Sequence, residues 1–328
     1  MRHSRFGLPA EVAELVDLPA LDDPAPGEVV IAGVLAPVHP ADLLSMEGRY
    51  GLRRAELPVF CGSDGIGRIA AVGGQVEHLR VGDRVPLLLA GVPTWREGMR
   101  AKAADLIALP DGDPQQLSLL GVNPITAWAL LRDVVPLGPG DWVVQNAAGS
   151  SVGRAVFTLA RRLGLRSVSV VRRADAVDEL VADGADVVLV DGDDLPRRIA
   201  EATGGQAPRL GIDAVGGAAT GRLGSSLARR GTLVAYGLLS GDPCTIDPAD
   251  IIFRDVSCKG FWLALWIRRK SREELEAAYR SLADLIADGT LHSPIAAVYP
   301  LSRIGPALAH AASGPSGKVL LELAEAGG

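Results

Sequence analysis

The segment WVVQNAAGSSVGRAVFTLAR, residues 142–161, joins a short apolar run, a turn of small residues and an amphipathic stretch. The apolar run predicts a buried strand, and the stretch after the turn predicts a helix. Small side chains in the turn would let backbone N–H groups approach a pyrophosphate, and the N-terminus of the helix favours negative charge. The segment therefore predicts either a dinucleotide-binding strand–turn–helix or, as the plainer alternative, a tight turn without a ligand.

The turn departs from the G-x-G-x-x-G fingerprint of dinucleotide sites, because Ser151 stands between Gly149 and Gly153. The motif alone is therefore a weak signal for a cofactor. The residues predicted to hold the pyrophosphate are Ala148, Gly149, Ser150, Ser151, Val152 and Gly153.

The strand after this helix indicates which dinucleotide binds. An NAD site normally carries an Asp or Glu about 20 residues past the glycines, where it binds the ribose 2′-hydroxyl. Here the strand SVSVV ends at Arg172 and Arg173. Guanidinium groups attract a 2′-phosphate, so the pair predicts NADPH rather than NADH. Two solvated arginines on a loop are the alternative.

The pattern of the chain changes on either side of the segment that alternates strands with helices. Residues 1–119 contain short strands bounded by Gly, Pro or Asp, and residues 261–328 are too few for a domain of their own. Residues 120–260 contain the βαβ pattern of a doubly wound parallel sheet. We expect an α/β fold in which this domain is inserted between the two halves of a β domain, with the ligand in the cleft between them.

The composition excludes several classes of function. The chain of 328 residues is 48% hydrophobic and 22% charged with a net charge of −6, which gives no basic field for a nucleic acid. No apolar run approaches the roughly 20 residues that span a membrane. We expect no export signal at the start of the chain. Three distant cysteines build neither a disulfide framework nor a Cys-x-x-Cys site, so we expect a reducing cytoplasm.

Several blocks resemble the medium-chain dehydrogenase/reductase superfamily, and within it the zinc-free 2-enoyl thioester reductases of the mitochondrial trans-2-enoyl-CoA reductase type. The blocks are HPADLLSMEGRYG, GVNPITAW, NAAGSSVGRAV, IDAVGG, LVAYG and IIFRDVSCKGFWLALW, and the resemblance runs from about Gly27 to Glu322. It implies a GroES-like β-barrel-type catalytic domain with an inserted Rossmann domain, and NADPH as cofactor. It also implies a homodimer through the Rossmann domain, with an edge strand near residues 234–239.

The resemblance also implies roles for single residues. Tyr50 matches the tyrosine regarded as catalytic. The further cofactor positions are Asn123, Thr126, Tyr236, Gly237, Phe261, Trp262 and Lys318. Trp95 matches a residue that lines the substrate cleft. The residues themselves give two further substrate predictions: Trp262 and Trp266 as an acyl pocket or plain core, and Arg53 and Arg54 as a site for a polyanionic carrier or as solvated charges. The chain departs from the family at His39, where Asn is usual, and at Ala174, where a second Arg is usual.

The resemblance also bears on metal chemistry. Zinc-dependent relatives have a Gly-His-Glu motif and an earlier cysteine as zinc ligands. Here the motif reads Gly62-Ser63-Asp64, and no cysteine lies near Ala41 or Asp42, so we predict no metal. Reduction of an activated C=C bond needs only hydride delivery and stabilisation of an enolate.

The reaction that this reading predicts is NADPH-dependent reduction of a trans-2-enoyl thioester of CoA or acyl carrier protein, within fatty acid metabolism. Hydride goes to the β-carbon, and Tyr50 orients the thioester or gives the α-carbon its proton. The alternatives are a zinc-free quinone oxidoreductase or enone reductase and, less favoured, an NADPH-binding partner or sensor without turnover.

Overall fold

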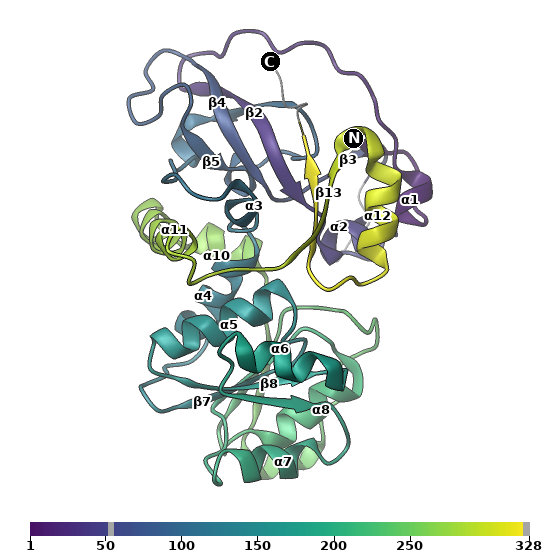
Figure 1. Cartoon of the computed structure of the whole chain (residues 1–328), viewed down its shortest axis with the longest axis vertical. Helices are drawn as coiled ribbons and strands as arrows, with labels where there is room; N and C mark the ends of the chain where they lie inside the picture. Colours follow the sequence, from purple (N-terminus) through teal and green to yellow (C-terminus); the bar gives the residue numbers. More distant parts are fainter. Residues whose placement is uncertain (52–55, 324–328) are drawn as a thin grey trace. The chain divides into compact units, whose positions relative to one another are not determined.

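Figure 1 shows a computed structural model of the chain, which describes residues 1–51 and 56–323. The chain divides into two compact units. The first unit consists of Met1–Val122 and Ser271–Gly328, and the second unit is Asn123–Lys270. The predicted insertion of one domain into another is thereby confirmed.

The second unit is built on a six-stranded parallel sheet in the order β9-β8-β7-β10-β11-β12. This order has two halves that diverge from the β7–β10 pair, as in dinucleotide-binding folds. The strands are β7 (Trp142–Gln145), β8 (Arg166–Val171), β9 (Val187–Val190), β10 (Leu210–Asp213), β11 (Thr232–Ala235) and β12 (Ser257–Gly260). The helices are α4 (Asn123–Asp133), α5 (Ser151–Arg162), α6 (Val177–Ala182), α7 (Leu195–Ala202), α8 (Gly217–Ser226), α9 (Pro248–Arg254) and α10 (Leu263–Arg269).

Both faces of this sheet are covered by apolar helix faces. Phe157 of α5 and Leu180 of α6 pack in one cluster, whereas Ile199 of α7 and Leu223 of α8 pack in another. Figure 1 shows α5 and α6 on one side of β8 and α7 and α8 on the other. The central strands β7 and β10 are therefore buried from both sides, as their largely apolar sequence predicts.

Two expectations about this unit need correction. The structure places residues 261–270 in the second unit rather than the first, because Trp266 Nε1 donates to Asp133 Oδ2 at 2.7 Å and Lys270 Nζ lies 3.0 Å from the same oxygen. The segment predicted as an edge strand, residues 234–239, is not at an edge: β11 pairs with β10 on one side and β12 on the other.

The first unit contains a mostly antiparallel sheet in the order β13-β14-β2-β4-β5, with β6 paired to β2 and a separate β1–β3 pair. Its strands are β1 (Arg2–His3), β2 (Glu28–Pro37), β3 (Val59–Phe60), β4 (Ile66–Val72), β5 (Arg84–Pro86), β6 (Gly98–Lys102), β13 (Ile295–Pro300) and β14 (Lys318–Glu322). Its helices are α1 (Pro9–Val12), α2 (Pro40–Met46), α3 (Pro114–Leu117), α11 (Arg272–Ala287) and α12 (Ile304–Ala312).

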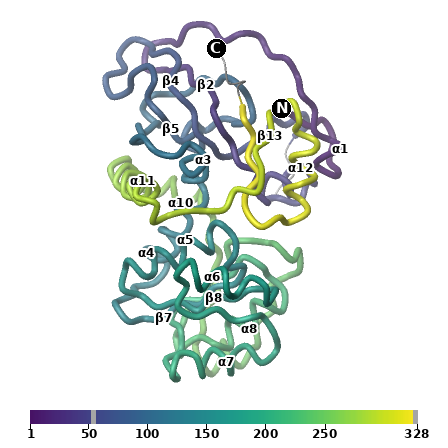
Figure 2. Tube along the Cα trace, viewed as in Figure 1, coloured from purple at the N-terminus to yellow at the C-terminus, as the bar shows by residue number. Residues whose placement is uncertain are grey.

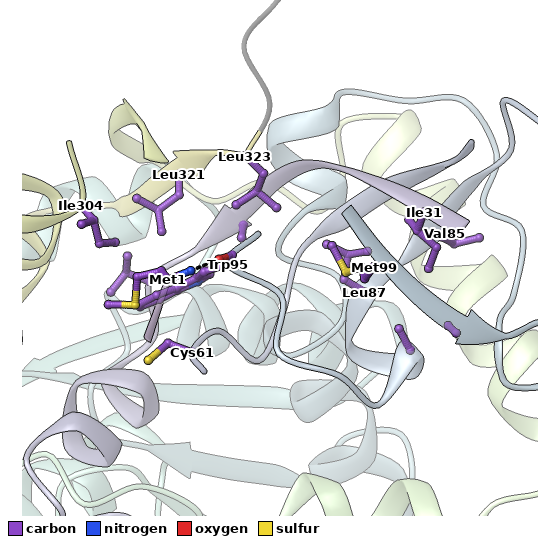
Figure 3. Packing of buried hydrophobic residues seen from close by; sticks show 14 of the residues in the cluster. Met1, Ile31, Cys61, Val85, Leu87, Trp95, Met99, Ile304, Leu321 and Leu323 are labelled. Carbon is purple, nitrogen blue, oxygen red and sulfur yellow. Dashed lines mark hydrogen bonds between the residues drawn. The ribbon is translucent and has the colours of Figure 1, made fainter. Parts of the chain in front are cut away.

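The end of the chain completes the sheet of the first unit. β14 pairs antiparallel with β2, and α1 packs against α12, so the purple start and the yellow end of the trace in Figure 2 lie side by side. The core beneath them contains Trp95, Met99 and Leu321, as Figure 3 shows. In the described chain no helix is long and apolar enough to cross a bilayer.

Candidate functional site

The predicted phosphate turn lies between β7 and α5. Ser150 is the N-cap of α5, and its hydroxyl accepts a hydrogen bond from the Gly153 N–H at 3.1 Å. A Cβ at Gly153 would lie 2.6 Å from the backbone of Ala148, so only glycine fits there, whereas a Cβ at Gly149 would meet nothing within 4 Å. The first turn of α5 has no acidic side chain, and its N-terminus therefore favours an anion.

Polar side chains fix the ends of the two strands beside this turn. Asn146 Nδ2 donates to Asp213 Oδ1 at 2.6 Å, and the Ala214 N–H donates to Asn146 Oδ1 at 2.8 Å. Thr220 Oγ1 donates to the other carboxylate oxygen of Asp213 at 2.6 Å. These bonds join the carboxyl ends of β7 and β10, where doubly wound sheets bind their ligands. Our sequence reading assigned no role to Asn146, Asp213 or Thr220.

Tyr236 and Gly237, at the end of β11, belong to the same edge of the sheet. The Tyr236 hydroxyl hydrogen-bonds the Ser150 side chain, and burial raises the pKa of Tyr236 above its ordinary value. A Cβ at Gly237 would lie 2.6 Å from the Ala214 carbonyl oxygen. The structure therefore brings Tyr236 to the phosphate turn, and it places Gly237 against the residue that follows β10.

Arg172 and Arg173 follow the last residue of β8, so they lie at the same carboxyl edge as the turn. Both are exposed. Arg173 Nε lies 3.2 Å from Asp175 Oδ1, and no hydrogen bond or ion pair involves Arg172 in the described chain. Both guanidinium groups are open to a ligand phosphate, and no carboxylate holds Arg172.

The residues of the second unit fit a dinucleotide with a 2′-phosphate. The turn leaves room at Gly149 and forbids a side chain at Gly153, and positive charge stands at the end of β8. The Asn123 Oδ1 atom is buried without a hydrogen-bond partner in the described chain, and Thr126, three residues on in α4, is also buried. An orphaned acceptor of this kind is expected where a bound molecule supplies the donor.

The predicted aromatic residues of this unit differ in exposure. Phe261 is partly buried and its N–H donates to the Ala235 carbonyl at 2.9 Å, whereas Trp262 is 48% exposed. The indole of Trp266 is tied to Asp133, and the Lys270 ammonium lies 5.5 Å from the centre of its ring. Trp262 is thus the aromatic side chain of α10 and its N-cap with the most surface available for a ligand.

In the first unit, Tyr50 lies in the turn after α2 and is 40% exposed. Glycines with positive φ flank it, Gly48 at 71° and Gly51 at 81°. Arg53 and Arg54 lie outside the described residues. Trp95 has no exposed surface and belongs to the hydrophobic core in Figure 3, so its predicted role as a substrate residue is wrong.

A buried polar cluster also lies in the first unit. His39 Nε2 lies 2.9 Å from Asp64 Oδ2, and His39 Nδ1 lies 3.1 Å from Lys318 Nζ. Asp42 accepts hydrogen bonds from the His39 N–H at 2.8 Å and from Ser63 Oγ at 2.9 Å. The sequence drew attention to Asp42, Ser63 and Asp64 as departures from zinc-dependent relatives and to His39 as a departure from the enoyl reductases. It predicted Lys318 as a cofactor position, and it did not predict that these residues meet.

Burial shifts the proton affinities of this cluster, which we define as His39, Asp42, Ser63, Asp64 and Lys318. It raises the pKa of Asp64 to about 8 and of Asp42 to about 6, and it lowers the pKa of Lys318 to about 8. The pKa of His39 is lowered by burial and by the Lys318 charge. Within the described residues, no group of His, Cys, Asp and Glu side chains could hold a metal ion.

Comparison with known proteins extends the similarity over both units. Two family models match, the Alcohol dehydrogenase GroES-like domain over residues 25–111 and the Zinc-binding dehydrogenase over residues 151–284. The chain is 35% identical over 322 residues to the human Enoyl-[acyl-carrier-protein] reductase, mitochondrial, with 93% of this chain and 83% of that protein covered.

Two solved structures share the whole fold. A putative NADPH:quinone reductase from Bacillus thuringiensis superposes with a TM-score of 0.89 at 27% identity, covering 98% of this chain and 97% of that one. The complex of Etr1p with NADP and crotonyl-CoA superposes with a TM-score of 0.84 at 25% identity, covering 98% of each chain. The similarity therefore includes a protein that binds NADP and an enoyl-CoA together.

Proposed function

The chain belongs to the zinc-free enoyl thioester reductases of the medium-chain dehydrogenase/reductase superfamily, and we propose that it reduces the C=C bond of a trans-2-enoyl thioester with NADPH. The observation that carries this proposal is the 35% identity to an enoyl reductase across both units. The residues at the carboxyl edge of the second-unit sheet support it, because they fit a dinucleotide with a 2′-phosphate.

In this proposal, bound NADPH supplies the hydride for the β-carbon. The turn from Ala148 to Gly153 holds the pyrophosphate at the N-terminus of α5, and Arg172 and Arg173 hold the 2′-phosphate. Asn123 Oδ1 accepts a hydrogen bond from the cofactor, which supplies the partner that this buried atom lacks. Tyr236 and Gly237 follow the last residue of β11, and the Tyr236 hydroxyl supports the turn through its hydrogen bond with Ser150.

Tyr50 is proposed to donate a hydrogen bond to the thioester carbonyl, whose oxygen gains negative charge as the enolate forms. A donor placed at such an oxygen stabilises the transition state more than the ground state, and this difference accelerates the reaction. The exposed ring of Trp262 offers apolar contact to the acyl chain. The carrier is CoA or acyl carrier protein. One similar protein is named an enoyl-[acyl-carrier-protein] reductase, and another is a complex with crotonyl-CoA.

A panel of acceptors tests this function. With purified protein and NADPH, we expect crotonyl-CoA and longer trans-2-enoyl-CoA esters to be reduced with a kcat/KM at least about 100-fold above that for a quinone or a small enone. NADPH oxidation followed by absorbance gives the rates. If a quinone is the best acceptor, the protein is instead a quinone reductase, like the similar structure from Bacillus thuringiensis. Cofactor binding without turnover of any acceptor would favour a sensor.

We also propose a homodimer through the second unit, now with β12 as its edge strand. β12 pairs only with β11 in the described chain, and all four of its residues are exposed. The helix α9, which precedes β12 in the chain, exposes Ile252 and Phe253. An open strand edge next to exposed apolar side chains is a surface that a second copy covers.

A charge on this surface should dissociate the dimer. We expect the parent to have twice the mass of one 34.1 kDa chain in solution, and Ile252→Asp to have the mass of one chain, as measured by light scattering. Val81→Asp is the matched control, because Val81 and Ile252 are both 67% exposed and Val81 lies in the first unit. A parent of single-chain mass would contradict the homodimer.

The cytoplasm remains our proposed location. All three cysteines are free thiols in the structure, which suits a reducing compartment. The human relative carries a mitochondrial name, so imaging of a tagged full-length chain in its own cells is the deciding measurement.

A further inference from the structure

The register of the first-unit sheet explains why three distant residues meet. β14 runs antiparallel to β2 with Leu320 opposite Pro37, and the Val38 N–H donates to the Val319 carbonyl at 3.0 Å. Continuing this register by two residues brings Lys318 to His39, immediately before α2 begins. Asp64 approaches the far side of the imidazole from the residues just before β4.

The imidazole of His39 bridges an ammonium and a carboxyl group through its two nitrogens. The contacts are 3.1 Å from Lys318 Nζ to Nδ1 and 2.9 Å from Nε2 to Asp64 Oδ2. Two arrangements with the same number of protons satisfy both contacts. In one, Lys318 is an ammonium, Nε2 carries the imidazole proton and Asp64 is a carboxylate. In the other, Lys318 is an amine, Nδ1 carries the proton and Asp64 is a carboxylic acid.

We propose that Asp64, His39 and Lys318 form a proton relay that supplies the α-carbon of the substrate, with Lys318 as the catalytic residue and His39 and Asp64 as positioning residues. This inference rests on the proposed enoyl reduction. In this inference Lys318 donates the proton, and Tyr50 only donates a hydrogen bond to the carbonyl oxygen of the thioester.

Protons and charge balance when the relay protonates the α-carbon. Hydride addition to the β-carbon of the substrate turns the C=C electron pair into an enolate with a nucleophilic α-carbon. A proton then leaves Asp64 for Nε2 of His39, a second leaves Nδ1 for Nζ of Lys318, and a third leaves Nζ to form the α-carbon C–H bond. Asp64 ends as a carboxylate, His39 stays neutral, and one proton from water restores the relay.

Burial gives the relay a direction. Asp64 has no exposed surface, His39 is 3% exposed and Lys318 is partly exposed, so Lys318 is the end of the relay nearest to solvent. Burial raises the pKa of Asp64 and lowers the pKa of Lys318, so it brings the proton affinities of the two ends of the relay closer together. Asp42 of α2 and Tyr279 of α11 are the other ionisable groups that interact with Asp64, and burial raises the pKa of both.

His39→Asn tests the relay, because an amide preserves hydrogen bonding but passes no proton. We expect kcat for crotonyl-CoA to fall about tenfold, with the dissociation constant of NADPH unchanged. The dependence of kcat on the D₂O fraction should be curved in the parent, since several protons move together, and linear in His39→Asn. His310→Asn is the matched control, because this partly buried histidine of the same unit bonds Tyr299 and lies outside the cluster. Equal kcat and equal D₂O curves in parent and His39→Asn would overturn the relay.

A spectroscopic measurement tests the relay without turnover. Nitrogen-15 spectra of the full chain should show a neutral His39 ring well below pH 6.5, and Lys318→Met should raise the pKa of His39, because the Lys318 charge now lowers it. Unchanged His39 signals in Lys318→Met would overturn the contact. Failure of every enoyl thioester in the acceptor panel, with this coupling present, would instead reject the proposed function and leave the hydrogen-bonded chain intact.

Discussion

Replacing Arg172 and Arg173 together by alanine should weaken NADPH binding about 100-fold and change NADH binding by less than about threefold. Hydrogen bonds to charged groups contribute about 1.5–3 kcal/mol each, and roughly 1.4 kcal/mol corresponds to a factor of ten. Both side chains are exposed, and Arg172 has no internal partner in the described chain, so the loss should fall on the ligand. Nucleotide fluorescence titrations give the two dissociation constants.

The matched control for this pair is the double substitution Arg229→Ala and Arg230→Ala. It removes the same charge from the same unit, but these arginines precede β11 and therefore lie at the amino edge of the parallel sheet. We expect it to leave both dissociation constants within about twofold. An equal loss of NADPH and NADH in the Arg172 and Arg173 variant would mean that the pair acts on the fold or on the pyrophosphate, and the NADPH assignment would lose its physical basis.

The sequence predicted the second unit well because its signals are local. The apolar run at β7, the small residues of the turn and the arginines after β8 follow one another within about thirty residues, and each has a physical reason that needs no distant partner. The prediction was wrong where contacts between distant residues determine which unit a segment joins. Residues 261–270 belong to the second unit because Trp266 and Lys270 bind Asp133, which lies more than a hundred residues earlier.

The buried cluster of the first unit could not be predicted from local sequence either, because its members are far apart in the chain. His39 and Asp64 are 25 residues apart, and His39 and Lys318 are 279 apart, so only the register of β14 against β2 shows that they meet. Trp95 shows a second limit, because a tryptophan that lines a site and a tryptophan that fills a core have the same sequence signal.

Tyr50→Phe should lower kcat/KM for crotonyl-CoA about 100-fold while the dissociation constant of NADPH stays unchanged. Removal of one hydrogen-bond donor from a developing oxyanion costs about 10²- to 10³-fold in rate, and phenylalanine removes only the hydroxyl. Tyr50 is 40% exposed, so its loss should leave the thermal unfolding midpoint within about 2 °C. Steady-state kinetics on the parent and the variant measure the effect.

Tyr299→Phe is the control for this substitution, because its hydroxyl bonds His310 at 3.1 Å within the same unit and has no part in the proposed chemistry. We expect its kcat/KM to remain within about twofold of the parent, and an equal loss in both variants would reject a specific role for Tyr50. The D₂O dependence of kcat then separates the two roles a tyrosine can have. If Tyr50 only orients the carbonyl, the slower variant keeps the curved dependence of the parent, because Lys318, His39 and Asp64 still deliver the proton. If Tyr50 is itself the proton source, a single proton moves in the step, and the dependence is already linear in the parent.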